Sequence, residues 1–81
     1  MGKIYVIKGV SIYLYYREHN PPHIHAFYAE FEVLIRISNG EILWGYLPKS
    51  QIRLVKQWLS DPEVKRKLTI MFHEMNPHLR P

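Results

Sequence analysis

The chain has 81 residues, a net charge of +4, 47% hydrophobic residues and no cysteine. This length leaves room for one domain with a modest core, and the missing cysteines exclude disulfides and thiolate zinc sites. We find no signal peptide and no apolar stretch of the roughly 20 residues that span a bilayer, so we expect a cytoplasmic protein outside the membrane. A basic charge suits RNA, an anionic surface or an acidic partner protein, and does not choose among them.

The first two thirds of the sequence predict a sheet over residues 3–47. Apolar and polar residues alternate in segments separated by turn residues, which is typical of half-buried strands. Asn39-Gly40 favours a tight hairpin turn, whereas Pro21 and Pro22 indicate a stiff connector because proline has no backbone N–H. The expected strands are 4–7, 10–16, 23–28, 31–38 and 41–46.

The last third predicts two helices, 48–59 and 62–76, followed by a tail, 77–81. Pro48 suits a first helical position, and Asp61 can cap the second helix. Strands followed by helices indicate an α+β fold with a single domain. We expect an antiparallel sheet of about five strands, with two C-terminal helices packed on one face.

The hairpin turns also predict which side chains share a face, because the register of paired strands sets the alternation of their side chains. If Asn39-Gly40 is a two-residue loop, the strands before and after it pair through large apolar side chains. We expect this set under the helices. The expected pairs are Ile37 with Ile42, Ile35 with Trp44, and Val33 with Tyr46.

A second hairpin loop, at Ala29-Glu30, places His23 and His25 on the opposite face, which no helix covers. In the strand 10–16, the same alternation sends Ile12, Leu14 and Tyr16 to the core. The uncovered face then gathers Tyr13, Tyr15, Arg17, His23, His25, Glu32 and Arg36.

The segments YYREHNPPHIHAFY and GYLPKSQIRLVKQW resemble a small bacterial family known as domain of unknown function 4160. The resemblance covers residues 12–58. It departs from the family pattern at Ala29, where a glycine is usual, and around Asp61-Pro62. The positions that match one by one are Glu18, His19, Pro21, Pro22, His23 and His25.

The resemblance implies no established activity. Members of this family are often encoded beside another small protein, in an arrangement like that of toxin and antitoxin pairs. We therefore expect a small partner protein encoded next door, while a fold alone does not settle function.

One function that the motif supports is cleavage of RNA through its own 2′-hydroxyl, which needs a general base, a general acid and a cation. His23 and His25 would be the acid–base pair, and Tyr15 would support them. Arg17 and Arg36 would clamp the phosphate. This interpretation describes a toxin-like, metal-independent endoribonuclease without a cofactor.

Two alternatives stay open. The first is a divalent transition-metal site at His19, His23 and His25, because imidazoles without cysteine suit zinc, nickel or iron. The second is a non-enzymatic module that binds a partner protein, with or without that metal. Tyrosine and arginine are frequent residues of protein interfaces. A homo-oligomer is also compatible with the sequence.

Overall fold

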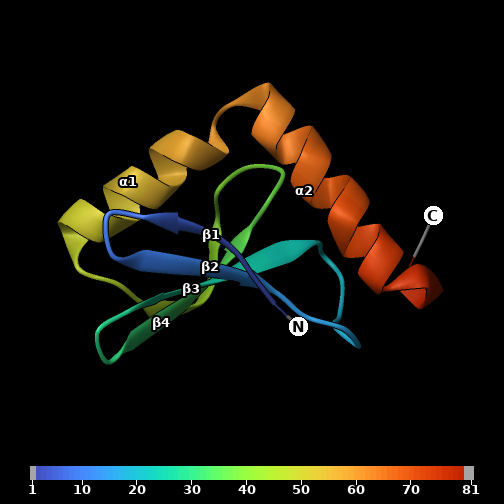
Figure 1. Ribbon diagram of the computed structural model, residues 1–81, viewed down its shortest axis with the longest axis horizontal. Helices are drawn as coiled ribbons and strands as arrows, with labels where there is room; N and C mark the ends of the chain where they lie inside the picture. The colour runs from blue at the N-terminus through green and yellow to red at the C-terminus, as the bar shows by residue number, and fades with distance from the viewer. Residues whose placement is uncertain (1, 80–81) are drawn as a thin grey trace.

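The computed structural model describes residues 2–79, which form one five-stranded antiparallel sheet and two α-helices. Helices α1 and α2 lie on the same side of the sheet (Figure 1). This arrangement confirms the predicted α+β class. The elements are β1 (Gly2–Ile7), β2 (Val10–Leu14), β3 (His23–Tyr28), β4 (Phe31–Arg36), β5 (Ile42–Tyr46), α1 (Lys49–Leu59), α2 (Pro62–Met75) and a short 3₁₀ helix (Pro77–Leu79).

The core lies between the sheet and the two helices. Ile12, Ala26 and Val33 are register partners on three neighbouring strands, and all three are fully buried. Val55 of α1 and Phe72 of α2 belong to the same buried cluster. Since each large apolar side chain contributes roughly 1.5–3 kcal/mol on burial, this layer supplies most of the free energy that favours folding.

The start of α2 follows from its sequence. The Asp61 carboxylate accepts a hydrogen bond of 2.8 Å from the backbone N–H of Glu63, and Pro62 occupies the first helical turn. The N–H groups of a first helical turn have no partner inside the helix. The Asp61 carboxylate satisfies one of them, and Pro62 has no N–H group to satisfy. Within residues 2–79, no helix is long and apolar enough to cross a membrane.

The register of β3 and β4 agrees with the prediction. Ala29-Glu30 forms the turn, His23 pairs with Arg36, and His25 pairs with Leu34. His25 therefore extends from the side of β3 opposite to the core. His23, the first residue of the strand, is buried instead, and its ring lies 5.7 Å from that of Phe72 of α2. Ala29 adopts a φ of 52°, a left-handed conformation that glycine adopts more readily than alanine.

The predicted register of β4 and β5 is wrong by one residue at Trp44 and Tyr46 and by two residues at Ile42. Ile35 pairs with Ile42 and Leu34 pairs with Trp44, with a bulge between these two pairs. A one-residue slip exchanges the faces of a strand. Trp44 is therefore 61% exposed and Tyr46 is 62% exposed, although both were expected in the core.

Two local features explain this slip. The backbone N–H of Arg36 donates to the carbonyl of Glu41 at 2.8 Å, and the N–H of Gly40 donates to the carbonyl of Arg36 at 2.9 Å, so the turn spans residues 37–40 instead of Asn39-Gly40 alone. Gly45 lies opposite Val33 on the core side with a φ of +86°, and a Cβ at this position would come within 2.2 Å of the Glu32 carbonyl oxygen. Only glycine fits there, so the large residues on either side of it face outward.

The expected burial of Tyr16 is also wrong. Strand β2 ends at Leu14, two residues earlier than predicted, and Tyr16 is 60% exposed. Arg17 then takes a φ of 61°, which turns the chain away from the direction of the strand. Alternation along β2 consequently ends before it reaches Tyr16.

The close approach of Gly45 to β4 can be tested by substitution. Gly45→Ala should lower the free energy of unfolding by about 2 kcal/mol or more, because the added carbon meets a backbone carbonyl. Urea denaturation measures this loss. Gly40→Ala is the matched control, since its φ is +76° but the nearest atom to the new carbon is 4.0 Å away. Equal losses in the two variants would contradict the observed register.

Candidate functional site at the uncovered face

The uncovered face of the sheet presents two rows of side chains that run across all five strands. Within each row, every residue is the register partner of the next one, from β1 across to β5. The first row is Lys3, Tyr13, His25, Leu34 and Trp44, and the second is Val6, Ser11, Phe27, Glu32 and Tyr46.

Aromatic rings gather on the β2 side of this face. Tyr13 and Tyr15 stack with centroids 5.8 Å apart and planes 7° apart, and Phe27 meets Tyr13 edge-on at 5.3 Å. These three rings and Ser11 line an open hollow of about 410 Å³. Because aromatic faces attract other planar rings, this hollow is suited to a flat ligand.

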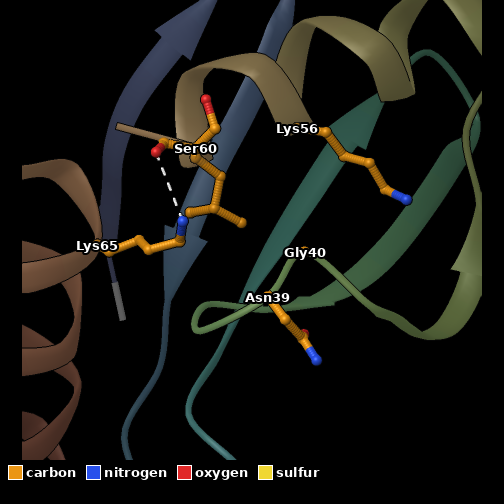
Figure 2. Close-up of a pocket in the computed structure, with 6 residues that line it drawn as sticks. Asn39, Gly40, Lys56, Ser60 and Lys65 are labelled. Carbon is orange, nitrogen blue, oxygen red and sulfur yellow. Dashed lines mark hydrogen bonds between the residues drawn. The ribbon is translucent and has the colours of Figure 1, made fainter. Parts of the chain in front are cut away.

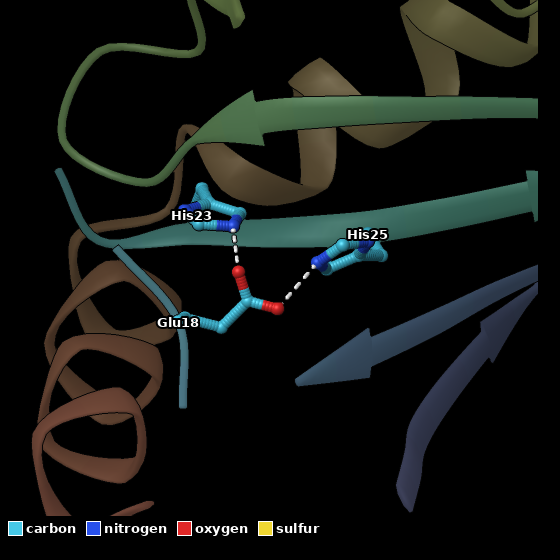
Figure 3. A group of neighbouring side chains, drawn as sticks. All are labelled: Glu18, His23 and His25. Carbon is cyan, nitrogen blue, oxygen red and sulfur yellow. Dashed lines mark hydrogen bonds and ion pairs between the residues drawn. The ribbon is translucent and has the colours of Figure 1, made fainter. Parts of the chain in front are cut away.

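Next to the hollow lies the Glu18 group, which consists of Glu18, His23 and His25 (Figure 3). One carboxylate oxygen of Glu18 lies 2.9 Å from Nε2 of His23, and the other lies 3.0 Å from Nε2 of His25. The three side chains are 17%, 5% and 12% exposed, respectively. The group is thus a nearly buried triad in which one carboxylate bridges two imidazoles.

The other ring nitrogens are also occupied. Nδ1 of His23 lies 2.8 Å from the carbonyl oxygen of Pro21, and Nδ1 of His25 lies 3.3 Å from the Glu32 carboxylate. A carbonyl oxygen only accepts hydrogen bonds, so Nδ1 of His23 must be the donor. All four ring nitrogens therefore face oxygen atoms.

Asn76, at the end of α2, holds the loop that carries Glu18. Its side-chain oxygen accepts from the backbone N–H of Glu18 at 2.7 Å, and its side-chain nitrogen donates to the carbonyl of Tyr15 at 3.0 Å. The same nitrogen donates to the carbonyl of Phe72, and the whole residue is buried. Sequence reasoning assigned Asn76 only to the helix end, and no local signal links it to a loop 58 residues away.

The structure brings together only some of the predicted site residues. Tyr15 packs edge-on against His25 with centroids 4.5 Å apart, so the proposed catalytic set of Tyr15, His23 and His25 does converge. Glu18, which the sequence analysis gave only as a matching motif position, is the residue that connects the two histidines.

The other predicted residues have different surroundings. His19 is exposed and does not belong to the Glu18 group, so the predicted set of three histidine ligands is replaced by two histidines and a carboxylate. Arg17 is exposed. Arg36 is the register partner of His23 and contacts Glu41 at 3.4 Å, and its buried Nε has no hydrogen-bond partner within residues 2–79.

A separate hollow is lined by residues of the β4–β5 turn and of the two helices. It measures about 90 Å³ and lies between the β4–β5 turn and the junction of the two helices (Figure 2). Lys65, which lines it, donates to the backbone carbonyl of Ser60 at 3.5 Å. This small space holds no cluster of acidic, histidine or nucleophilic side chains, and we assign no function to it.

The fold and the Glu18 group define a small α+β protein with a histidine–carboxylate triad beside an aromatic face. The chain belongs to the family described as "Domain of unknown function (DUF4160)", whose model matches residues 9–64. The match includes the whole triad but ends before Asn76. Comparisons with curated proteins and with solved structures find no match.

The surroundings of Tyr15 alter the acidity of its phenol. Its pKa is raised from the ordinary value of 10.0, first because of burial and then because Tyr13, Glu32 and Glu18 lie nearby. Its phenol consequently stays protonated at neutral pH and is able to donate a hydrogen bond.

This shift predicts a pH dependence. In a titration followed by tyrosinate absorbance, Tyr15 should ionise above pH 10.0, and Tyr15→Phe should remove that late component. The folded protein holds this proton more tightly than the unfolded chain does. The free energy of unfolding should therefore fall as the pH rises through about 10, and this fall should be smaller in Tyr15→Phe. Tyr16→Phe, at the exposed neighbour, is the control. Loss of the late component in that variant instead would contradict the assignment.

Proposed function

We propose that this protein binds single-stranded RNA across its uncovered sheet face, as the toxin-like member of a two-protein system. The observation that carries the proposal is the stacked pair of Tyr13 and Tyr15 over an open aromatic hollow. A sheet face with exposed aromatic rings is a recurring platform for unpaired bases.

The physical basis of binding is base stacking. Each base that stacks on an aromatic side chain contributes roughly 1–3 kcal/mol, and this contribution tolerates many sequences because every base has a planar face. Tyr13 and Trp44 lie in the same row, on strands β2 and β5, with His25 and Leu34 between them. The row therefore offers two separate stacking positions across the sheet.

Charge supports the same proposal. Lys3 is the register partner of Tyr13 in the first row of the uncovered face. The chain as a whole carries a net charge of +4. Lysine beside a stacking position can contact the phosphate that links two neighbouring nucleosides. Glu32, in the second row, contacts His25, and its negative charge opposes a phosphate group at that position.

Cleavage of the bound RNA is a separate step. The prediction that His23 and His25 act as acid and base stays a prediction, and it requires Glu18 to release at least one Nε2 atom. Binding alone requires no such movement. A cytoplasmic location is part of the proposal and is supported by the absence of cysteine from the sequence.

The proposal predicts that Tyr13→Ala weakens RNA binding. For a fluorescent single-stranded oligoribonucleotide, the loss of one stacking position should raise the dissociation constant about 5- to 100-fold. Fluorescence anisotropy at a fixed salt concentration measures it. Tyr5→Ala is the matched control, because Tyr5 is exposed but stacks on Trp58, on the helix side of the sheet.

Equal effects of the two substitutions, or no binding by the unaltered protein, would contradict the RNA proposal. The same variants extend the test to cells. Expression of the chain without its neighbour should slow growth, and Tyr13→Ala should relieve that effect while Tyr5→Ala retains it.

A second candidate function is binding of a partner protein at β5. Four of the eight exposed large hydrophobic residues within 2–79 lie on this edge strand, and none of its five residues is charged. Edge strands of this kind can pair with a strand of another protein, and most proteins protect them with lysine or proline. The four residues are Ile42, Leu43, Trp44 and Tyr46.

This candidate predicts that a charge on the edge blocks the partner. Leu43→Lys should abolish co-purification with the protein encoded next door, because lysine on an edge disfavours pairing with another strand. Ile70→Lys is the control, since Ile70 is similarly exposed but lies on α2. Co-purification that survives Leu43→Lys would rule out β5 as the docking strand.

A further inference from the structure

We propose that the Glu18 group binds one divalent transition-metal ion, through Nε2 of His23, Nε2 of His25 and a carboxylate oxygen of Glu18. The ion belongs to the class of zinc, nickel and iron(II), because imidazole nitrogens suit these metals and an all-oxygen set suits magnesium or calcium. This site goes beyond RNA binding and does not depend on it.

The first argument is the spacing of the ligand atoms. Zinc bonds of 2.0–2.1 Å at tetrahedral angles place the ligand atoms about 3.3 Å from one another. In the Glu18 group, the two nitrogen–oxygen distances are 2.9 and 3.0 Å, and one ligand atom from each residue fits within 4.8 Å of the other two. The two short distances involve different oxygens of Glu18, so tetrahedral coordination requires the carboxylate to turn until one oxygen and both nitrogens surround the ion.

The second argument is the direction of the ring nitrogens. The carbonyl of Pro21 requires a proton on Nδ1 of His23, and the Glu32 carboxylate favours a proton on Nδ1 of His25. A neutral ring with its proton on Nδ1 presents the lone pair of Nε2 to Glu18. Two lone pairs and a carboxylate then converge on one point, which is the electronic arrangement that a cation requires.

The Nδ1 partners are themselves characteristic of metal sites. Histidines that bind a metal almost always donate their other ring N–H to a carboxylate or a backbone carbonyl, which holds the ring in orientation. His25 has the first kind of partner in Glu32, and His23 has the second in Pro21.

The third argument is that the site is rigid before any ion binds. His23 packs against Phe72 of α2 with centroids 5.7 Å apart, and His25 packs against Tyr15. Asn76 holds the backbone of Glu18. Ligands that are already positioned lose little conformational entropy on binding, which favours affinity.

Charge and burial point the same way. Glu18 and Glu32 place two carboxylates around a nearly buried centre, and a buried carboxylate is unfavourable without a compensating positive charge. One divalent ion balances both. Three protein ligands leave a fourth position for water or another small ligand, as in zinc sites that exchange ligands rather than closed structural sites.

The test is metal titration of the protein purified without a histidine tag and freed of metal with a chelator. Zinc binding, followed by calorimetry, should reach one equivalent, and Co²⁺ should give the visible absorption of tetrahedral coordination. Zinc should also raise the melting temperature, because a ligand that binds the folded state stabilises it.

Variants identify the ligands. Glu18→Gln and His25→Gln preserve side-chain size and should each weaken zinc binding more than 100-fold, whereas Glu32→Gln, which removes only the partner of a ligand, should weaken it about 10- to 100-fold. His19→Ala is the matched control, because His19 is an exposed histidine in the same loop. It should bind zinc like the unaltered protein.

Two outcomes would overturn the site. One is less than stoichiometric zinc binding by the unaltered protein, which would make the Glu18 group an ion-paired structural triad. The other is a loss of affinity in His19→Ala as large as that in Glu18→Gln. The zinc titration contains no RNA, so its failure leaves the RNA proposal standing. The anisotropy assay, run with a chelator present, tests RNA binding alone.

Discussion

The candidate site depends on the buried side chain of Asn76. This amide makes hydrogen bonds to Glu18 and Tyr15 across a separation of about 60 residues, and so joins the end of α2 to the loop between β2 and β3. A buried amide of this kind is costly unless its donors and acceptor are satisfied, so the contact specifies one position of the loop. The carboxylate of Glu18 consequently meets both imidazoles, although it belongs to no strand or helix.

A second constraint divides the sheet into two different surfaces. Alternation along β2, β3 and β4 sends aliphatic side chains under the helices and leaves tyrosine, histidine and glutamate on the other side. Gly45 extends that division to β5, because no side chain fits between this strand and the Glu32 carbonyl. The tryptophan and tyrosine beside Gly45 therefore enlarge the aromatic face instead of the core. The surface available for binding is a consequence of backbone packing at one glycine.

The triad and the aromatic face are neighbours, so the chemistry of one affects the other. His25 belongs both to the first row of the uncovered face and to the Glu18 group, and Glu32 contacts it from the second row. Two carboxylates at the margin of this face oppose the approach of phosphate groups. A divalent cation held by the triad would offset that charge, and it would do so beside the hollow lined by Tyr13 and Tyr15. The metal and a nucleic acid would then favour each other electrostatically.

Sequence alone determined the order of strands and helices, the α+β class and the Ala29-Glu30 register, because alternation and turn residues are local signals. It therefore predicted the strand partners of His23 and His25, but not the burial of His23 against Phe72 of α2. It could not determine the register of β5, since Asn39-Gly40 also fits the longer turn that the hydrogen bonds of Arg36 with Gly40 and Glu41 close. Nor could it identify Asn76 or the bridging position of Glu18. Those contacts exist only after α2 packs on the sheet, and tertiary structure alone decided them.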